Sequence, residues 1–312
     1  MTDPLTGWRI LGGMTFEHQY LALLARVVNT GRLRPTGAVL PSSGQFLDAH
    51  TLFAPDPIRC DLSAGFPAVT VKRLAFRQVV AELLWFLSGS TNVEDLRAMG
   101  CHIWDEWADD DGDVGPSYGH NWRRFGGGDR WRGVDQIRQL VEGILATVDN
   151  PRDRTGRRLL LTALNPVSVE SAGLYPCHPL AQWDVEDGRL SCSFYQRSAD
   201  LFLGTPFNLA SYALLTHLLA SVAGLDVGTL TMHIGNAHVY ANHVPQVREM
   251  LGRQPHPSPL LSMPMGLDFH AIMAGTHLPS FRHKDTGLPV GLDDFALVGY
   301  EHHGALPGEV AV

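Results

Sequence analysis

The 312-residue sequence lacks the marks of an exported or membrane-embedded protein. Its first residues, Met-Thr-Asp-Pro, have neither the basic nor the apolar region of a signal peptide. No apolar run approaches about 18 residues, the length that predicts a membrane span. No Cys-x-x-Cys pair occurs, so we expect reduced thiols at Cys60, Cys101, Cys177 and Cys192. These absences predict a cytoplasmic protein with no membrane partner.

The sequence also lacks an excess of positive charge. Its formal net charge is −8, which argues against a nucleic-acid partner, because nucleic-acid binding usually needs a basic surface. A few clustered arginines can still hold a small phosphate. His238 and His243 have no third ligand nearby, so no metal is expected. No His-Glu-x-x-His helix occurs, and we expect neither a serine hydrolase nor a zinc enzyme.

Hydrophobic residues make up 45% of the chain and charged residues 18%, so a large core can form. Apolar residues at helical spacing predict four helices, at about residues 16–28, 76–87 (ended by Gly89), 134–147 and 208–222. We expect one mixed α/β domain over residues 1–312, because no internal repeat or linker interrupts the chain.

Short apolar runs predict the strands, at residues 159–163, 180–185 and 190–196. The Asp187-Gly188 step predicts a tight hairpin turn between the last two. Residues 29–65 are rich in Gly, Pro, Ser and Asp, which predicts loops with at most short strands. Residues 255–264 contain several prolines and predict irregular chain.

Cys177 lies in a Tyr-Pro-Cys-His-Pro segment, and a lone cysteine in this setting is usually a small core residue. Several other segments change that interpretation. They are residues 81–87, 103–108, 115–119, 195–200, 203–212 and 238–243. Together with the cysteine segment, in this order, they resemble the thymidylate synthase family. The resemblance runs from about residue 65 to 243, resumes at the C-terminus, and so covers most of the chain.

The resemblance implies a single-domain α/β fold, with a mixed sheet, packed helices and a sheet-mediated homodimer. It implies transfer of a one-carbon unit from 5,10-methylenetetrahydrofolate to C5 of a pyrimidine nucleoside monophosphate. C6 of the pyrimidine accepts a thiolate, which makes C5 nucleophilic. Cys177 would supply the thiolate, and Arg197 would approach both this sulfur and the phosphate. Because a free thiol is mostly protonated at neutral pH, we expect cationic neighbours to favour the ionised form.

Glu82 lies between apolar neighbours in the strongest predicted helix, where a carboxylate is either costly or functional. The resemblance implies a general acid/base role for Glu82. It implies that Tyr118 assists removal of the C5 proton. Asp200 would bond the pterin ring of the folate.

The resemblance also assigns the nucleotide contacts. The phosphate would be held by Ser198 and Arg197 and, across the dimer interface, by Arg157 and Arg158. Guanidinium groups suit this role because they present a planar fork of donors. Asn208 offers both a donor and an acceptor, which favours uracil over cytosine. The sugar 3′-hydroxyl would be bound by His238 and Tyr240.

For the folate, the resemblance implies a wall of apolar residues with Lys72 nearby: Trp104, Trp107, Leu203, Gly204 and Phe207. The C-terminal residues 308–312, Ala311 among them, resemble a lid that closes over the bound substrates. Closure would exclude water from the reactive carbon.

The sequence departs from the family pattern around the phosphate and sugar. In the Arg-Pro-Thr-Gly segment at 34–37, Pro35 stands where a phosphate-binding arginine is usual, and Arg32 or Arg34 could replace it. Residues 29–64 diverge as a whole, Ala75 replaces a usual histidine, and Asn236 replaces a usual aspartate.

These departures leave three hypotheses open. The first is reductive methylation of dUMP to dTMP, which the retained Trp104 favours. The second is hydroxymethylation of CMP, dCMP or dUMP, in which water replaces hydride. The third is an inactive nucleotide-binding regulatory protein.

Overall fold

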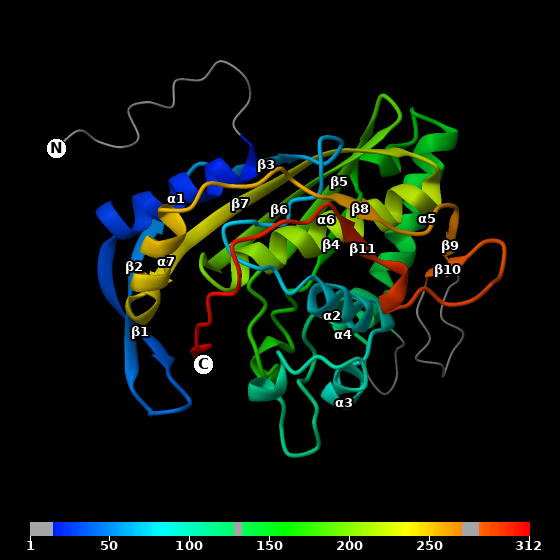
Figure 1. Cartoon of the computed structure of the whole chain (residues 1–312). Coiled ribbons are helices and arrows are strands. Elements are labelled where there is room, and N and C mark those ends of the chain that lie inside the picture. Colours follow the sequence, from blue (N-terminus) through cyan, green and yellow to red (C-terminus); the bar gives the residue numbers. More distant parts are fainter. Residues whose placement is uncertain (1–14, 128–132, 270–280) are drawn as a thin grey trace.

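A mixed β-sheet with helices packed on it forms the centre of the computed structural model, which describes residues 15–127, 133–269 and 281–312 (Figure 1). The α-helices described are α1 (Phe16–Thr30), α2 (Phe76–Ser88), α3 (Val93–Arg97), α4 (Tyr118–Arg124), α5 (Gln136–Asp149), α6 (Gly204–Ala223) and α7 (Val244–Leu251). Short 3₁₀ turns are η1 (Asp105–Trp107), η2 (Arg154–Arg157), η3 (Val169–Ser171), η4 (Ala241–His243) and η5 (Leu292–Asp294). In the parts of the chain described, no helix is long and apolar enough to span a membrane.

The main sheet has the strand order β1-β2-β7-β6-β5-β4, and β3 also pairs with β7. Its strands are β1 (Arg32–Val39), β2 (Phe46–Phe53), β3 (Ile58–Asp61), β4 (Leu160–Thr162), β5 (Leu180–Glu186), β6 (Arg189–Asp200) and β7 (Asp226–Tyr240). The β6–β7 pair is parallel and the other pairs are antiparallel. Two small two-stranded sheets lie apart from it, formed by β8 (Leu260–Ser262) with β11 (Ala296–Val298), and by β9 (Leu267–Phe269) with β10 (Phe281–His283).

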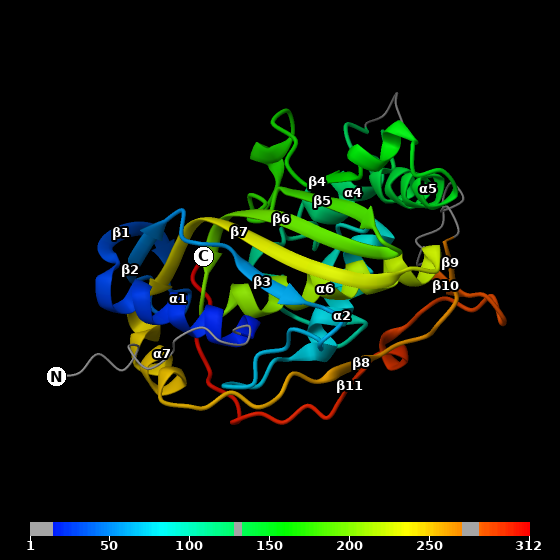
Figure 2. The ribbon, with the colours of Figure 1, turned by 90° about the horizontal axis from the view of Figure 1, so that it is seen from above.

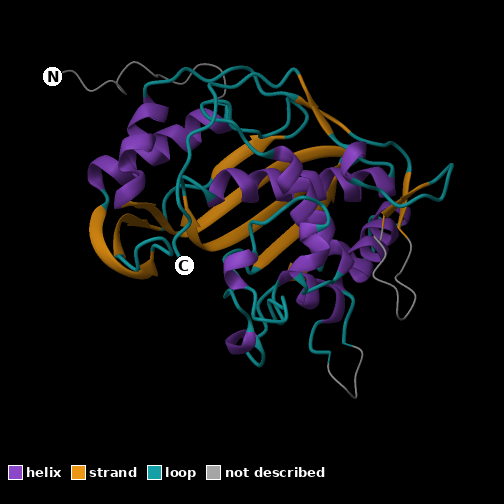
Figure 3. Ribbon diagram, turned by 60° about the horizontal axis from the view of Figure 1, so that its bottom comes forward, coloured by secondary structure: helices purple, strands orange, loops and turns teal. Residues whose placement is uncertain are grey.

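One face of the sheet is buried under α6. Along β6, Leu190, Cys192 and Phe194 are buried, while the alternating Ser193 and Tyr195 are exposed. Successive side chains of a strand point to opposite faces, so this alternation means that one face is covered and the other is open. Helix α6 is apolar on nearly all sides because it lies between the sheet and α2 (Figure 2). Figure 3 shows this helix layer in front of the central strands.

Most predicted elements are confirmed. The helix predicted at 16–28 begins at Phe16, where the Thr15 side chain caps its first turn. The helix predicted at 76–87 ends at Gly89, which has a φ of 77° as a C-terminal glycine often does. The β5–β6 turn has φ values of 49° at Asp187 and 73° at Gly188, so both residues are left-handed as this hairpin turn requires.

The prediction that residues 29–65 form loops with at most short strands is wrong. Strands β1 and β2 have 8 residues each, and they pair with one another. Pro35 does not prevent this, because β1 is the edge of the sheet and needs no partner on its outer side. The segment 34–37, expected as a phosphate-binding loop, therefore lies inside a strand.

The turn at residues 40–45, between β1 and β2, is bonded to the C-terminal tail. Val39 and Val312 exchange two backbone hydrogen bonds, of 2.7 and 3.0 Å. The carboxylate of Glu309 accepts bonds from the Ser42 N–H at 2.9 Å and from the Ser42 hydroxyl at 2.8 Å. We call these four residues the tail latch. The latch ties the divergent N-terminal segment to the last residues of the chain.

Candidate active site

Arg197 on β6 holds the loop that carries Cys177. Its guanidinium donates from Nε to the Pro176 carbonyl at 2.8 Å and from Nη2 to the Tyr175 carbonyl at 2.6 Å. The same Nη2 lies 3.9 Å from the Cys177 sulfur. Its guanidinium carbon stacks 4.6 Å from the centre of the Tyr175 ring. The loop and the strand are thus fixed together, with a cation beside the thiol.

The four cysteines are free, but their surroundings differ. Cys60, Cys101 and Cys192 are buried, and burial raises the pKa of each thiol, that of Cys101 to about 11. Cys177 alone is half-buried and lies beside an arginine. It is therefore the cysteine suited to act as a nucleophile.

The expectation that cations favour the Cys177 thiolate is only partly met in the single chain. Burial raises the pKa of Cys177 above its usual value, Arg197 lowers it, and Asp200 raises it again. The net direction is upward, because burial outweighs the guanidinium. Ionisation of this sulfur therefore depends on Arg197, the one cation that lowers its pKa among the residues described.

Tyr118, at the start of α4, fixes the backbone of the nucleophile. Its hydroxyl oxygen accepts hydrogen bonds from the N–H groups of Cys177 at 2.7 Å and His178 at 3.4 Å. The His178 ring stacks on the Tyr118 ring at 4.1 Å, and its Nδ1 lies 3.0 Å from the Tyr212 hydroxyl. Burial lowers the pKa of His178 to about 3 and raises that of Tyr118 well above its usual value. Both side chains are therefore uncharged at neutral pH.

Glu82 on α2 is buried and accepts a hydrogen bond of 2.7 Å from the indole N–H of Trp104. Burial raises its pKa from 4.5 to about 7, and the Trp104 bond opposes part of that rise. A carboxyl group with a pKa near 7 can both take and give a proton at neutral pH. The pKa of Glu82 therefore lies in the range that the predicted acid/base role requires.

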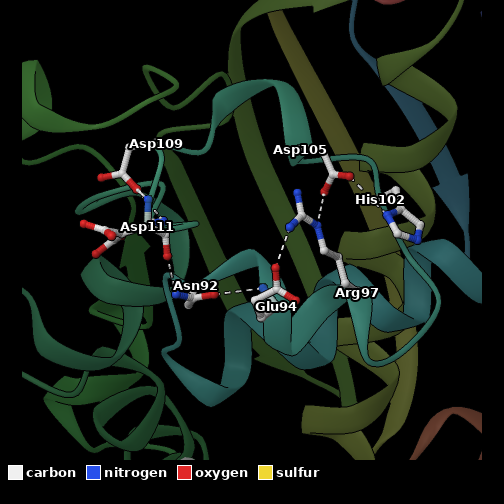
Figure 4. Close-up of polar contacts among 8 residues, drawn as sticks. Asn92, Glu94, Arg97, His102, Asp105, Asp109 and Asp111 are labelled. Carbon is white, nitrogen blue, oxygen red and sulfur yellow. Dashed lines mark hydrogen bonds and ion pairs between the residues drawn. The ribbon is translucent and has the colours of Figure 1, made fainter.

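The loop with Trp104 and Trp107 is held by a polar cluster (Figure 4). Asp105, between the two tryptophans in sequence, is 3.0 Å from Arg97 Nε and 3.1 Å from His102 Nδ1. Arg97 also pairs with Glu94 on α3. Burial tends to raise the pKa of Asp105, but Arg97 and His102 lower it overall, so the acid stays ionised. These bonds fix the ring pair, whose centres are 5.6 Å apart.

Asp200 ends β6, just before α6, and Asn208 lies near the start of that helix. The Asn208 Oδ1 accepts a bond of 2.9 Å from the Gln196 amide, which also donates to the Ser198 carbonyl at 3.0 Å. Asp200 caps the turn through Oδ1, which accepts from the N–H groups of Phe202 and Leu203 at 2.8 and 3.2 Å. Its Oδ2 has no partner among the residues described.

The half-buried residues predicted to wall the folate pocket surround this turn: Leu203, Gly204 and Phe207. A Cβ added to Gly204 would lie 3.6 Å from Asn208 Oδ1 and 3.9 Å from the Asp200 Cβ. The predicted base-reading and pterin-binding residues are therefore neighbours.

His238 and Tyr240, at the end of β7, lie beside the same group. His238 pairs in register with Asp200, and its ring is 5.1 Å from that of Tyr240. Burial raises the pKa of Tyr240 to about 12, with the charges of Asp200 and Cys177 acting in the same direction. Burial also lowers the pKa of His238, against the effect of Asp200. Neutral donors of this kind suit a sugar hydroxyl.

Lys72 is buried, unlike most lysines. Its ammonium donates to the Phe202 carbonyl and lies 4.2 Å from the centre of the Phe202 ring. Burial lowers its pKa to about 8, and Asp200 opposes this. The predicted folate-side lysine is thus held inside the site.

The C-terminal tail also packs against Phe202. A Cβ added to Gly308 would lie 2.7 Å from Phe202 Cε1 and 2.8 Å from His243 Nε2. The carbonyl of Glu309 lies 3.1 Å from the same His243 nitrogen. Ala311, three residues beyond Gly308, is half-buried. The tail therefore lies next to the predicted folate pocket.

Two predicted residues are not brought into this group. Arg157 and Arg158, just before β4, are exposed, and no contact between described residues joins them to Cys177 or Arg197. Conversely, the sequence analysis missed roles for His178 and Gln196, which the structure places against Tyr118 and Asn208. Both residues lie within segments that resemble the family, at 175–179 and 195–200, and this position was the signal in the sequence that could have identified them. In the described ranges, no cluster of His, Cys, Asp or Glu could hold a metal.

The fold and the site together define a class of protein. In this class a mixed sheet holds a thiol next to a guanidinium group, and a buried carboxyl group and several aromatic rings lie nearby. The family model for thymidylate synthase matches residues 18–312. The chain therefore belongs to the thymidylate synthase family. This family uses methylenetetrahydrofolate as co-substrate, and membership supports a folate-dependent one-carbon transfer to C5 of a pyrimidine.

Proposed function

We propose that the protein methylates C5 of dUMP to give dTMP, with 5,10-methylenetetrahydrofolate as the source of the carbon and the hydride. The observation that carries this proposal is the 3.9 Å contact between the Cys177 sulfur and Arg197 Nη2, on a loop fixed by Tyr118. The same contact favours an enzyme over a regulatory protein without catalysis, because a protein that only binds a nucleotide needs no thiol held beside an arginine.

In this mechanism the Cys177 sulfur bonds to C6 of the base, and the electron pair of the C5–C6 double bond makes C5 nucleophilic. C5 then bonds to the donated carbon and loses its proton, and the bond from that carbon to the folate nitrogen breaks. Hydride from the tetrahydrofolate reduces the carbon to a methyl group, and the sulfur leaves C6 as the ring double bond reforms, which gives dTMP and dihydrofolate. Glu82, with its pKa near 7, moves protons around the base, and Tyr118 assists at C5. Arg197 offsets the negative charge of the sulfur before attack and after release.

The donor sets fit both substrates. Asn208 presents an amide to uracil, while His238 and Tyr240 present neutral donors to the 3′-hydroxyl. Asp200 keeps Oδ2 free for a donor of the pterin ring, and the rings of Trp104 and Phe207 supply flat apolar surface. When bound, the folate supplies the carbon at the oxidation level of formaldehyde. The chain's own residues orient the two substrates, exclude water and move protons.

The open face of the sheet supports a homodimer. Leu180, Tyr195 and His233 are register neighbours on three adjacent strands, and all three are exposed. Leu180 and Tyr195 are 44% and 41% exposed, which is unusual for large apolar side chains in the middle of a sheet. A second copy packed on this face would bury them and could bring Arg157 and Arg158 to the partner's phosphate. Sedimentation that finds only monomers would contradict this arrangement.

Hydroxymethylation of CMP, dCMP or dUMP is the second candidate. The observation that favours it is strand β1, which replaces the expected phosphate loop and so changes the surroundings of the nucleotide's phosphate and sugar. We also propose a cytoplasmic location, because all four thiols are free.

One assay separates these functions. The protein is incubated with methylenetetrahydrofolate and C5-tritiated dUMP, UMP, dCMP or CMP, and both tritium release and dihydrofolate are followed. Methylation gives both signals, hydroxymethylation gives tritium release alone, and a regulatory protein gives neither. Cys177→Ser is expected to abolish turnover and keep nucleotide binding, whereas the buried Cys101→Ser serves as the matched control. Turnover that survives in Cys177→Ser would overturn the catalytic assignment.

A further inference from the structure

The turn at residues 40–45 supplies no cation for a phosphate, and the arginines that precede it, Arg32 and Arg34, lie in the edge strand β1. The turn at residues 40–45 precedes β2, the strand that pairs with β7 and so borders the sugar-binding residues. This turn contains no lysine or arginine. Its Ser42 N–H and hydroxyl are already bonded to the Glu309 carboxylate. A carboxylate at this place repels a phosphate, so the missing positive charge must come from elsewhere.

The segment at residues 153–158, which we call the arginine turn, carries such charge. Its 3₁₀ turn, η2, contains Arg154 and Arg157 three positions apart, and Arg158 follows at once. Residues at i and i+3 of a 3₁₀ helix project from the same side, so Arg154 and Arg157 face the same way. Both side chains are exposed. Two guanidinium groups on one side of a short turn form a local site for an anion.

The arginine turn is rigid. Asp153 Oδ1 accepts from the Thr155 N–H at 2.7 Å and from the Thr155 hydroxyl at 2.6 Å, which caps the turn. A Cβ on Gly156 would lie 3.1 Å from the Thr147 methyl group, so the turn packs closely on α5. The guanidinium groups are therefore presented by a fixed backbone, which limits the entropy lost when they bind an anion.

These arginines are also unpaired in a chain with many acids. Among the described residues, Arg154, Arg157 and Arg158 form no ion pair, although the positive charge of Arg158 helps to lower the pKa of Asp153. The chain has 32 acidic residues against 24 basic ones, and it nevertheless places these three guanidinium groups within residues 154–158. Such a cluster is suited to a ligand with two negative charges.

We propose that Arg154 is a third phosphate-binding guanidinium, acting with Arg157 and Arg158 on the nucleotide held by the partner subunit. It supplies the positive charge that the turn at residues 40–45 lacks. This inference rests on the proposed function, because it needs the dimer and the nucleoside monophosphate. Three planar forks can each meet a different oxygen of a phosphate dianion.

The first test compares single variants. Arg154→Ala is expected to raise the KM for dUMP, and the inhibition constant of inorganic phosphate, by roughly tenfold, with little change in kcat. Arg154→Lys keeps the charge but loses the fork, so an intermediate KM is expected. Arg152→Ala is the matched control, because Arg152 is exposed and precedes the capped turn. Equal changes in the Arg152 and Arg154 variants would overturn the proposal, since they would show a general effect of charge.

The second test is a hybrid dimer in which one subunit carries Cys177→Ser and the other carries Arg154→Ala. Its single competent site combines Cys177 of the second subunit with Arg154 of the first, so a wild-type KM is expected. A KM equal to that of the Arg154→Ala homodimer would overturn action across the interface. Arg157→Ala tests the proposed function separately. If Arg157→Ala binds dUMP normally, the proposed site shared between subunits is wrong. If Arg157→Ala weakens binding but Arg154→Ala does not, only the role of Arg154 is wrong.

Discussion

Replacement of Glu82 by glutamine should make the stability of the protein less dependent on pH. A pKa raised from 4.5 to about 7 means that the folded chain binds this proton more tightly than the unfolded chain. The folded state therefore loses stability as the pH rises from 4.5 to 7. The change in pKa corresponds to about 3 kcal/mol, reached only once the pH is above 7. Glutamine carries no charge at any pH, so Glu82→Gln should avoid this loss.

The measurement is denaturant unfolding of the wild type and Glu82→Gln at pH 4.5, 6 and 8, at one protein concentration. As the pH rises across this range, the free energy of unfolding of Glu82→Gln should increase relative to that of the wild type by up to about 3 kcal/mol. Glu106→Gln, an exposed carboxyl group in the same stretch as Trp104, is the matched control and should show a constant difference. Infrared titration should find a protonated carboxyl signal that disappears near pH 7 and is absent from Glu82→Gln.

The same variant should lose about 10²- to 10⁴-fold in turnover, because general acid/base catalysis is typically worth that factor. The reasoning is refuted if the stability difference between wild type and Glu82→Gln is independent of pH. It is also refuted if the infrared signal titrates near pH 4.5, since Glu82 would then be solvated and ordinary.

Three further predictions follow from single contacts. Trp104→Phe removes the N–H that lowers the pKa of Glu82, so the infrared midpoint should move above 7; a downward shift would contradict this. Arg197→Ala should raise the pKa of Cys177 and slow its alkylation by iodoacetamide at pH 8, whereas Arg197→Lys should slow it less; equal rates in all three proteins would speak against a role in ionisation. Glu309→Gln weakens the bonds to Ser42, so the Val312 amide should exchange hydrogen about tenfold faster, with no change expected at Leu218 in α6.

The sequence predicted the helices well because their apolar spacing is dictated by the core. In α2 the residues at i, i+3 and i+4 are buried, and Gly89 ends the helix in the conformation that glycine favours. The β5–β6 hairpin was equally clear, because an Asp-Gly step suits its turn. Local chemistry decides these elements, so no long-range information was needed.

The strands depended more on their neighbours. In β7, Leu230, Met232 and Ile234 alternate with polar residues, which is a usable strand signal, although no strand was predicted at residues 226–240. In β1, a proline and a glycine indicate a loop, and only its edge position makes the strand possible. The edge position of β1 results from its pairing with β2, and the residues of β1 by themselves do not reveal this pairing.

The sequence named residues that the structure places close together, but it did not predict their electrostatics. The motifs named Cys177, Arg197, Asp200 and Tyr240, and the structure brings these four together. The raised pKa of Cys177 could not be predicted, because it depends on how much apolar structure surrounds the sulfur compared with its distance from Arg197. Burial of this kind is a property of the folded chain.

The tail latch also has a consequence for the sequence changes that the protein can accept. Turns between strands usually tolerate insertions and deletions, since few contacts depend on their length. Here one residue added or removed between Val39 and Ser42 would shift the hydroxyl that holds Glu309 while Val312 stayed paired. Changes of length in this turn should therefore be accepted only together with compensating changes in residues 309–312, although the two segments lie at opposite ends of the sequence.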